Sequence, residues 1–577
     1  MPRSRPITTS AAQVEDRSPE VEEQPLEDRE PSVDSRSWVP FAAWGTGAYL
    51  LVTGSLLAFS LMVTGGTFVY LIDDPAIHLS MARTLAETGT WGVVPGQFQS
   101  ASSAPLWTLA LSAVHLVSPV AAKVAPIIFN VGFSIAVIVL LARYQDVLRP
   151  RRDRPLDGIA VAFLCVFVLF LPGLTLLGME HVAHLALVVA IVIAFGRAAS
   201  RSSAWPGWTL IVLLAVAALV RFESSFVALG LAIATVVVPS ALPVTRRVQR
   251  SVVIVAAAAV PTAAFALFNR AMGQGWLPNS VLAKAQVVSG SSDRSAMPSA
   301  ILERLTTDPV VIGLVILAAG IAIVGWGRWA SVRLAVAFLV ATSLHMSFAG
   351  VGWFDRYQAY LVGFGVVVLL GTGTEIGVGD RLASRGRVSL RPALLVLALV
   401  LLCGTKIGLT RKVPVGVEDT YQQRYQAARF LERYYHGEPI ATGELGYISL
   451  FHDGPLTDVL GLGDFDVLQM RRENHQEVPP AKWAQLAHDR GFRVVAVDPL
   501  TLFTDTPDEW ILVGEWHLDR DPVTAFGETF QFWATTPEEV APLQQHLRDF
   551  ESEMPEGARL DLNDLASYRA EQMLAGG

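Results

Sequence analysis

Leu71-Ile-Asp-Asp-Pro-Ala-Ile-His-Leu-Ser80 directly follows the first long apolar run of the chain. The stretch places two adjacent carboxylates, Asp73 and Asp74, where that run is expected to leave a membrane. Acidic side chains at membrane depth cost free energy unless water, a cation or a substrate group offsets their charge. The stretch therefore predicts a functional loop at the surface of a membrane-embedded fold.

The composition of the whole chain is typical of a polytopic membrane protein. Of its 577 residues, 52% are hydrophobic and 17% are charged, and the mean hydropathy is +0.43. The net charge of -8 argues against binding to nucleic acid, which requires a clustered basic surface. Both cysteines, Cys165 and Cys403, lie in apolar runs, which favours packing over a disulfide or a metal site.

Apolar runs indicate where the chain crosses the bilayer. A helix needs about 20 residues to span the hydrocarbon, and fewer when neighbouring helices help. About 11 transmembrane helices are expected on this criterion, at residues 40–63, 121–142, 156–173, 181–197, 205–220, 223–240, 251–268, 309–327, 330–350, 357–372 and 391–410. The polar residues 1–38 have the composition of a disordered tail.

Arginine-rich connectors predict the sidedness, because positively charged loops stay in the cytoplasm. These connectors lie at residues 143–154, 197–201, 245–250, 328–333 and 381–391. All five face the cytoplasm only if the apolar piece Pro105–Pro119 is a short re-entrant or interfacial helix, within a first outer loop at residues 72–120. If that piece is instead an ordinary span, every later connector changes side.

The re-entrant alternative gives a multi-pass protein of the plasma (inner) membrane with a cytoplasmic N-terminus. The transmembrane domain is then residues 39–410, and residues 411–577 form an extracytoplasmic α/β domain, because their composition is that of a soluble protein. Helices are expected there at residues 422–435, 481–490 and 537–550, the last of them exposed, and strands at residues 440–451, 493–497 and 529–534.

The acid pair is suited to acid–base chemistry. A carboxylate that takes the proton of a sugar hydroxyl typically contributes about 10²–10⁴-fold to the rate. Asp74 is also a possible ligand for a divalent cation such as Mg²⁺ or Mn²⁺, although no strong metal motif is present. Either acid could instead cap the helix that begins near Pro75.

Further ionisable residues are expected on the same face of the membrane. His78 lies one helical turn after Asp74, and Arg83 either pairs with the acids or lies on a solvated helix face. The remaining candidates stand at the ends of predicted spans, and they are Glu180, Arg221, Glu223, Lys284 and Arg356. Arg221 and Glu223 could simply pair with each other, and the cations Lys284 and Arg356 suit a phosphate unless they extend to the membrane interface.

The motifs resemble those of the GT-C superfamily of glycosyltransferases. Asp73–Arg83 with Ser103-Ala-Pro-Leu-Trp107 is similar to its first outer loop, and the closest resemblance is to the AftB-like arabinofuranosyltransferase group. Further matches keep the same order along the chain: Gly178-Met-Glu180, Arg221-Phe-Glu223, Leu277-Pro-Asn-Ser280, Ala283-Lys284, Asp355-Arg-Tyr357, Gly443–Tyr447 and Asp458–Asp464. Pro75, Ser80 and Ala104 depart from that group's pattern, which leaves the donor sugar open.

The resemblance implies an inverting transferase that moves a sugar, arabinofuranose in the AftB-like group, from a polyprenyl-phosphate donor to a cell-envelope glycan or lipid acceptor at the outer leaflet. Asp73, with Asp74, would supply the general base. Lys284 and Arg356 would hold the donor phosphate. The other motif residues, among them Asn279 and Tyr357, would contribute to substrate binding.

Two other classes remain as alternatives. A transporter also combines many spans with ionisable groups, but it more often has broken helices or repeated halves, and the sequence shows no repeat. A non-catalytic envelope-assembly protein could carry an outer domain on a membrane anchor. Such a protein has no evident use for carboxylates and cations on several loops.

Overall fold

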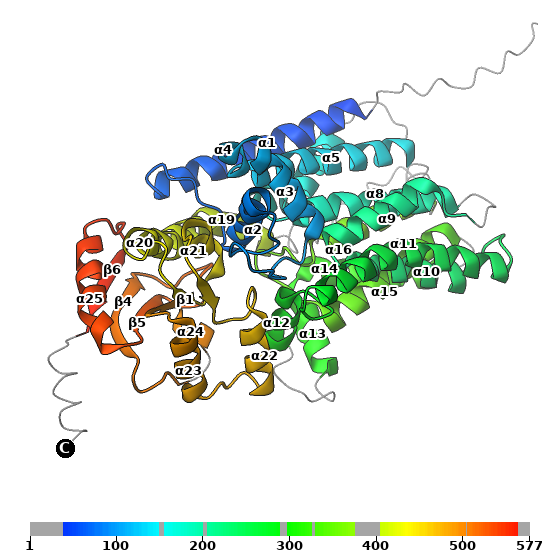
Figure 1. The fold of residues 1–577 in the computed structure, drawn as a ribbon. Coiled ribbons are helices and arrows are strands. Elements are labelled where there is room, and N and C mark those ends of the chain that lie inside the picture. The colour runs from blue at the N-terminus through cyan, green and yellow to red at the C-terminus, as the bar shows by residue number, and fades with distance from the viewer. Residues whose placement is uncertain are drawn as a thin grey trace, which may run out of the picture.

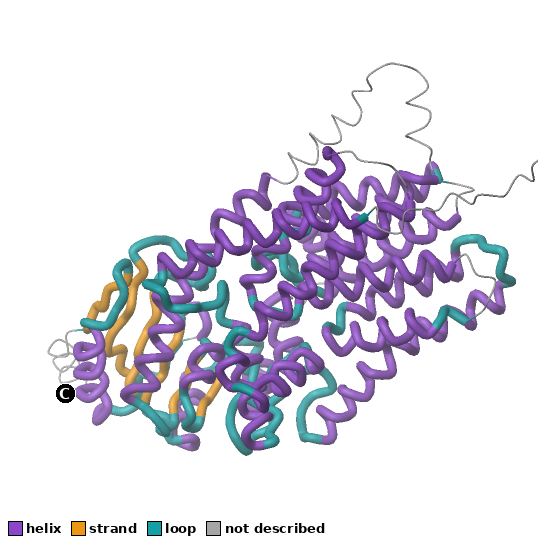
Figure 2. Tube along the Cα trace, turned by 90° about the horizontal axis from the view of Figure 1, so that it is seen from above, coloured by secondary structure: helices purple, strands orange, loops and turns teal. Residues whose placement is uncertain are grey.

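The computed structural model describes residues 38–148, 155–199, 205–288, 297–325, 329–375, 404–502 and 505–563. Helices form an elongated bundle, and a smaller region that contains all the described strands adjoins one end of it (Figures 1 and 2). The helices before residue 376 are α1 Val39–Val63, α2 Asp74–Thr88, α3 Pro105–Val117, α4 Pro119–Ala122, α5 Ala125–Leu148, α6 Pro155–Phe163, the π-helical η1 Leu164–Val168, α7 Leu171–Leu177, α8 His181–Ala199, α9 Trp208–Val220, α10 Ser224–Val237, α11 Val244–Ala271, α12 Asn279–Val288, α13 Met297–Thr307, α14 Pro309–Val324, α15 Trp329–Phe348 and α16 Ala359–Glu375.

Within the described residues, six helical segments are long and apolar enough to cross a membrane. They are Val39–Val63, Ala125–Tyr144, Ile159–Leu177, His181–Ala198, Val244–Ala271 and Trp329–Phe348. A bent pair, Ile301–Thr307 with Pro309–Val324, raises the number to seven if it is one span. The bundle is therefore that of a polytopic membrane protein.

The predicted number of about 11 spans is not confirmed. Helices occupy the first ten predicted runs, but α9 and α10 have only 13 and 14 residues. A helix of 13 residues is about 20 Å long, which is shorter than the hydrocarbon layer. The predicted run at 391–410 lies largely outside the described residues. Helix α3, at 13 residues, is as short as expected for the piece Pro105–Pro119.

Helix α8 lies inside the bundle, between α5, α9 and α16. Its apolar side chains point in all directions and most of them are buried, from Val182 to Phe195. A helix that is apolar all round is stable only when neighbouring helices or lipid cover it. Cys165, in η1, is buried without a disulfide, in line with a packing role; Cys403 lies outside the described residues.

The second region contains a six-stranded mixed sheet with the strand order β2-β1-β3-β5-β4-β6. Strand β1 pairs in parallel with β2 and β3, and the remaining pairs are antiparallel. The elements of this region are α19 Gly404–Thr420, the π-helical η3 Tyr421–Tyr425, α20 Gln426–Tyr434, β1 Ile440–Thr442, α21 Leu445–Phe451, β2 Leu456–Asp458, α22 Phe465–Glu473, α23 Pro480–Arg490, β3 Val494–Val497, α24 Pro499–Leu502, β4 Ile511–Leu518, β5 Thr529–Ala534, α25 Pro537–Glu551 and β6 Ala558–Leu562.

A continuous helical stretch from Gly404 to Tyr434 connects this region with the bundle. The boundary expected between residues 410 and 411 falls inside α19. At the far end of the stretch, the ring of Phe430 packs edge-on against Trp516, Phe532 and Phe550, with centroid distances of 5.8, 5.1 and 5.6 Å. Through this aromatic cluster, helix α20 packs against one face of the sheet.

The predicted helices and two of the predicted strands of this region are confirmed. The expected strand at residues 440–451 is wrong beyond Thr442, because Leu445–Phe451 forms helix α21. An apolar run of that length has no periodicity that separates a buried strand from a buried helix. Contacts with helix α2, described below, stabilise the helical form of this segment.

Helix α25 is not the exposed helix that the sequence predicts. Leu543, Leu547 and Phe550 recur at helical spacing and are buried against the sheet. Gly514 in β4 leaves room for this packing, since a Cβ atom there would lie 3.0 Å from a methyl group of Leu547. The helix is therefore part of the core of this region.

Replacement of Leu547 by Ala is expected to lower the free energy of unfolding by about 2–5 kcal/mol, because it removes buried methyl groups and leaves a cavity. Thermal or denaturant unfolding of the purified full chain measures this change. Arg548→Ala, on the exposed side of the same helix, is the matched control. Equal unfolding midpoints for the two variants would contradict the packing of α25.

Candidate active site

Helices α2 and α21 lie side by side, although they are far apart in the sequence. The carboxylate of Asp73 accepts hydrogen bonds from the backbone N–H groups of Gly446 at 2.6 Å and Tyr447 at 2.8 Å. These N–H groups belong to the first turn of α21, where a helix has no backbone acceptors of its own. A Cβ atom at Gly446 would lie 2.2 Å from the Asp73 carboxylate, so the approach requires glycine.

The other end of α21 is held by the same helix α2. Arg83 donates to the carbonyl oxygens of Leu450 at 2.8 Å and Ser449 at 3.1 Å, and the Ser80 hydroxyl also donates to Ser449 at 2.9 Å. A negative group at a helix N-terminus and a positive group at its C-terminus both interact favourably with the helix dipole. The two charges of α2 therefore fix α21 at both ends.

Asp73 thus caps a helix, but not the helix that the sequence suggested. It stands at the N-cap position of α2, and its side chain makes no capping hydrogen bond there. Burial raises the pKa of the Asp73 carboxyl, while Arg424 and the two N–H groups oppose this shift. Arg424 in turn donates to Glu444 at 2.8 Å, which extends the polar network into the second region.

Asp74 points to a different place from Asp73. It lines a partly open cavity at the junction between the bundle and the second region, where the empty space, open solvent included, is about 400 Å³. Five of the predicted site residues line this cavity: Asp74, His78, Arg221, Arg356 and Tyr357. The other lining residues are Ile77, Ala101, Ser103, Met179, His181, Ser280 and Leu462. Of the residues expected to converge on the acid pair, Arg221 and Arg356 line this cavity, and Glu180 and Glu223 do not.

Arg356 is the cation that lies against Asp74. Its Nη2 atom is 2.7 Å from Asp74 Oδ2 and donates to the Tyr357 hydroxyl at 2.8 Å. The Arg356 side chain is only 5% exposed, and its Nε and Nη1 atoms are buried without a hydrogen-bond partner among the described residues. Burial lowers the pKa of Arg356, but Asp74 and Tyr357 more than offset this, so the pKa is raised and the charge is retained.

An unusual backbone segment positions Arg356. Trp353–Asp355 all have left-handed φ angles of 48° to 58°, after Gly352 at 88°. Such conformations cost non-glycine residues about 1–3 kcal/mol each and persist only when their surroundings hold them. Here the Asp355 carboxylate pairs with Lys406 and accepts from Gln358 at 2.8 Å. Helix α19 therefore helps to hold the turn that presents Arg356.

Arg221 also lines the cavity, and its guanidinium group is paired with carboxylates. It donates to Glu180 at 2.6 Å and to Glu223, and its Nη1 lies 3.1 Å from His181 Nε2. The Arg221–Glu223 pair that the sequence left as an alternative is therefore present, and Glu180 joins it. His78 Nε2 lies 3.7 Å from the second oxygen of Glu180, which ties α2 to the same group.

The motif around Asn279 contributes a different residue from those predicted. Asn279 is buried, and its side chain donates to Gln274 at 3.1 Å away from the cavity lining. The adjacent Ser280 lines the cavity with a hydroxyl oxygen that has no hydrogen-bond partner in the described part of the chain. The side chain of Lys284 lies outside the described residues, so its predicted phosphate contact stays a prediction.

Several polar residues of the site were not predicted. Arg424 and Glu444 lie behind Asp73, and both belong to the second region. The motif Gly443–Tyr447 contains Glu444, but nothing in its spacing indicates that the side chain meets Arg424. Within the described ranges, no three His, Cys, Asp or Glu residues come together to hold a metal ion, and Asp74 pairs with Arg356.

Comparisons with known proteins show no family for the whole chain. Residues 415–534 match a family described as a domain of unknown function (DUF8728), and no curated protein matches. Among solved structures, the oligosaccharyltransferase of Archaeoglobus fulgidus with a tethered acceptor peptide has 10% identity over 85% of this chain and 74% of its own, with a TM-score of 0.41. The same enzyme in complex with Zn and sulfate has 10% identity over 88% of this chain and 74% of its own, with a TM-score of 0.40.

A third similar structure is the mycobacterial arabinofuranosyltransferase AftD. It has 14% identity over 85% of this chain, which spans only 41% of the AftD chain, and its TM-score is 0.44. At TM-scores below 0.5, these likenesses carry no functional argument. The AftB-like group that the motifs resemble is not confirmed by them.

The pH dependence of stability is expected to report on Glu444. Burial raises the pKa of this carboxyl from its usual 4.5 to about 7, against the opposing effect of Arg424. Because the folded protein binds this proton more tightly than the unfolded chain, the resulting stability is complete below pH 4.5 and is lost as the pH rises through about 7. Glu444→Gln should flatten the decline in unfolding temperature between about pH 5 and pH 8.

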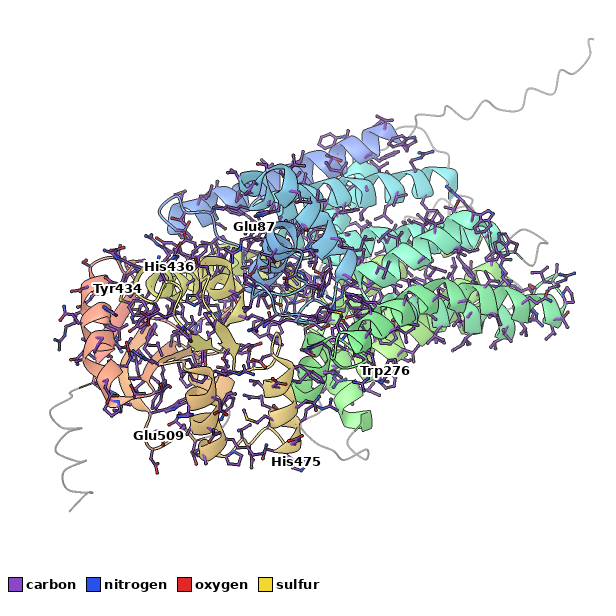
Figure 3. The ribbon with its side chains drawn as sticks, viewed as in Figure 1. Glu87, Trp276, Tyr434, His436, His475 and Glu509 are labelled. Carbon is purple, nitrogen blue, oxygen red and sulfur yellow. The ribbon has the colours of Figure 1, made fainter. Side chains whose placement is uncertain are left out.

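Thermal unfolding of the purified full chain across that pH range measures the effect. Glu509→Gln removes an exposed carboxylate of the same region (labelled in Figure 3) and should retain the wild-type pH dependence. Parallel pH profiles for wild type and Glu444→Gln would contradict the assignment.

Proposed function

We propose that this protein is a GT-C-type membrane glycosyltransferase that moves a sugar from a polyprenyl-phosphate donor to a cell-envelope glycan or lipid at the outer leaflet. The observation that carries the proposal is the juxtaposition of Asp74 with Arg356 in one cavity between the bundle and the second region. A carboxylate beside a buried, incompletely bonded guanidinium is the pair that transfer from a phosphate-linked sugar requires. The motif resemblance supports the same class, and the departures at Pro75, Ser80 and Ala104 leave the donor sugar open.

Asp74 is the general base in this proposal, in place of Asp73. The Asp73 oxygens already accept two backbone hydrogen bonds, and Asp73 is not among the residues that line the cavity. Asp74 lines the cavity and lies one helical turn before His78. We therefore assign chemistry to Asp74 and a positioning role, through α21, to Asp73.

The reaction is a single displacement. An acceptor hydroxyl beside Asp74 gives its proton to the carboxylate and attacks the anomeric carbon of the donor sugar. The bond between that carbon and the phosphate oxygen breaks, and polyprenyl phosphate leaves with the bonding electron pair. Attack from the side opposite to the leaving group inverts the anomeric centre.

Arg356 is the proposed phosphate ligand. Its Nε and Nη1 groups have no partner among the described residues, so they can donate to phosphate oxygens without breaking a hydrogen bond. A planar guanidinium suits a phosphate geometrically, and its charge offsets the charge that develops on the leaving group. Arg221 is already balanced by two carboxylates, so its proposed role is to hold the wall of the cavity.

Asp74→Asn is expected to reduce transfer by about 10²–10⁴-fold, because it keeps the shape of the side chain and removes the base. Sugar transfer would be measured in membranes that contain the variant and are supplied with polyprenyl-phosphate sugars. In cells that lack the wild-type protein, mass spectrometry would compare the envelope glycans with and without the variant. Glu87→Gln, at the exposed end of α2 (Figure 3), is the control with the same change of charge. Wild-type transfer by Asp74→Asn would exclude this residue as the base.

Asp73→Asn is expected to lose activity for a different reason, which is a loss of stability. It places an amide against the N–H groups of Gly446 and Tyr447, so the unfolding temperature should fall along with the activity. Asp74→Asn should lose activity with a smaller loss of stability. If Asp74→Asn lowered the unfolding temperature more than Asp73→Asn, the result would contradict the division of roles between the two acids.

Arg356→Lys is expected to weaken donor binding about tenfold or more, because a lysine keeps the charge but lacks the planar fork. Initial rates at varied concentrations of a polyprenyl-phosphate sugar would show a raised KM for the donor with an unchanged KM for the acceptor. Arg270→Lys, on an exposed position in the last turn of α11, serves as control. An unchanged donor KM in Arg356→Lys would remove Arg356 from the phosphate site.

A further inference from the structure

A second polar cluster lies at the end of the bundle away from Asp74. Arg247 and Arg250 come from the first turns of α11, and Arg333 comes from the first turns of α15. They surround the C-terminal end of α10, which Figure 1 shows at the end of the bundle farthest from the sheet. None of these arginines belongs to the site described above.

Two of the three arginines are buried and incompletely bonded. Arg250 is 3% exposed and Arg333 is 7% exposed. Arg250 Nε and Nη2 and Arg333 Nε have no hydrogen-bond partner, and neither arginine forms an ion pair with a carboxylate in the part of the chain that the structure describes. A buried charge without a partner costs roughly several kcal/mol, so most buried charges in proteins have a partner.

The backbone offsets only part of this charge. Arg247 donates to the carbonyl oxygens of Val236 at 2.9 Å and Val238 at 3.2 Å, and Arg333 donates to that of Pro239 at 3.2 Å. The carbonyl groups of Val236, Val238 and Pro239 lie at or just after the C-terminal end of α10, where the helix dipole supplies about half a negative charge. Arg250 donates no hydrogen bond to any described residue, so the capping of α10 accounts for Arg247 and Arg333 but not for Arg250.

Arg250 and Arg333 line one partly open cavity, where the empty space, open solvent included, is about 240 Å³. Its other polar lining residues are Thr235 and Ser240, whose side chains are hydroxyls, and Phe195 and Leu242 complete it. Two guanidinium groups and the Ser240 hydroxyl supply hydrogen-bond donors, whereas the Thr235 hydroxyl already donates to the carbonyl oxygen of Leu231 at 2.7 Å. No carboxylate lines the cavity. This lining is complementary to a phosphate group, which accepts several such hydrogen bonds and carries the opposite charge.

The surroundings indicate that the phosphate belongs to a lipid. Ile233 and Val237 on α10 are 41% and 65% exposed, and Val248 and Val252 on α11 are 44% and 61% exposed. Apolar side chains that are exposed on helices of a membrane bundle are suited to contact with acyl chains. Basic pockets between transmembrane helices bind the head groups of anionic lipids in the same way.

We propose that Arg250 and Arg333 bind the phosphate of an anionic lipid in the leaflet opposite to the catalytic cavity. The separation along α11 supports the opposite leaflet. Asn269, 19 residues after Arg250 on the same helix, accepts a hydrogen bond from Ser100 beside the catalytic cavity. Nineteen helical residues span about 28 Å, close to the thickness of the hydrocarbon layer. This lipid is bound at a site separate from that of the sugar donor.

Thermal unfolding and native mass spectrometry of the delipidated full chain test the proposal. The probes are the anionic lipid phosphatidylglycerol, the zwitterionic lipid phosphatidylcholine and inorganic phosphate. Phosphatidylglycerol should raise the unfolding temperature of the wild type, since a ligand of the folded state stabilises it by mass action. Arg250→Gln and Arg333→Gln should weaken this binding about tenfold or more, which corresponds to about 1.4 kcal/mol.

The matched control is Arg246→Gln, an exposed arginine on α11 that does not line the cavity, and it should bind phosphatidylglycerol as the wild type does. Without lipid, Arg250→Gln should be at least as stable as the wild type, because it removes a buried charge that has no partner. Equal binding of phosphatidylglycerol by wild type and Arg250→Gln would overturn the site. Equal binding of phosphatidylcholine, or a response to inorganic phosphate alone, would overturn the anionic lipid as its ligand.

Discussion

The capture of α21 by α2 is the interaction on which the candidate site depends. Asp73 binds the N-terminal N–H groups of α21, and Arg83 binds its C-terminal carbonyl groups. Both ends are charge-assisted and lie between the bundle and the sheet-containing region, where few water molecules compete. Because α21 follows β1 directly, this contact also sets the position of the sheet relative to the first loop of the bundle.

Consecutive positions in α2 allow the two acids to serve different purposes. Neighbouring residues of an α-helix point about 100° apart, so Asp73 and Asp74 cannot both face the same partner. One carboxylate faces α21 and the other faces Arg356. Each is balanced by a different cation, since Arg424 lies near Asp73 and Arg356 contacts Asp74. The two cations offset part of the repulsion between the adjacent carboxylates, although Asp74 still raises the pKa of Asp73.

Much of the architecture was predictable because it depends on local chemistry. Apolar runs locate helices wherever burial in lipid or protein dominates, and the ionisable residues at their ends, such as Arg221 and Arg356, are costly enough to indicate a site. The division between Asp73 and Asp74 was not predictable, because the partner of Asp73 lies 373 residues away in the sequence. The same distant contact decides that Leu445–Phe451 is helical, which its apolar pattern leaves open.

The predicted number of spans is not confirmed, for a related reason. Hydropathy treats each apolar run as if it crossed the bilayer alone, whereas α9 and α10 are short helices that pack against longer neighbours. The sequence shows the charge of Arg250 as part of a connector that is predicted to be cytoplasmic, but it does not show that this side chain is buried.

The long separation between Asp73 and α21 has a consequence for biosynthesis. At the usual rates of translation, the ribosome adds 373 residues in about 20–75 s, so the bundle is inserted well before the backbone that Asp73 binds has been made. During that interval the loop that carries both acids has no partner at α21. Under the proposed function, the newly inserted chain therefore lacks a complete site until α21 has been made and has packed against α2.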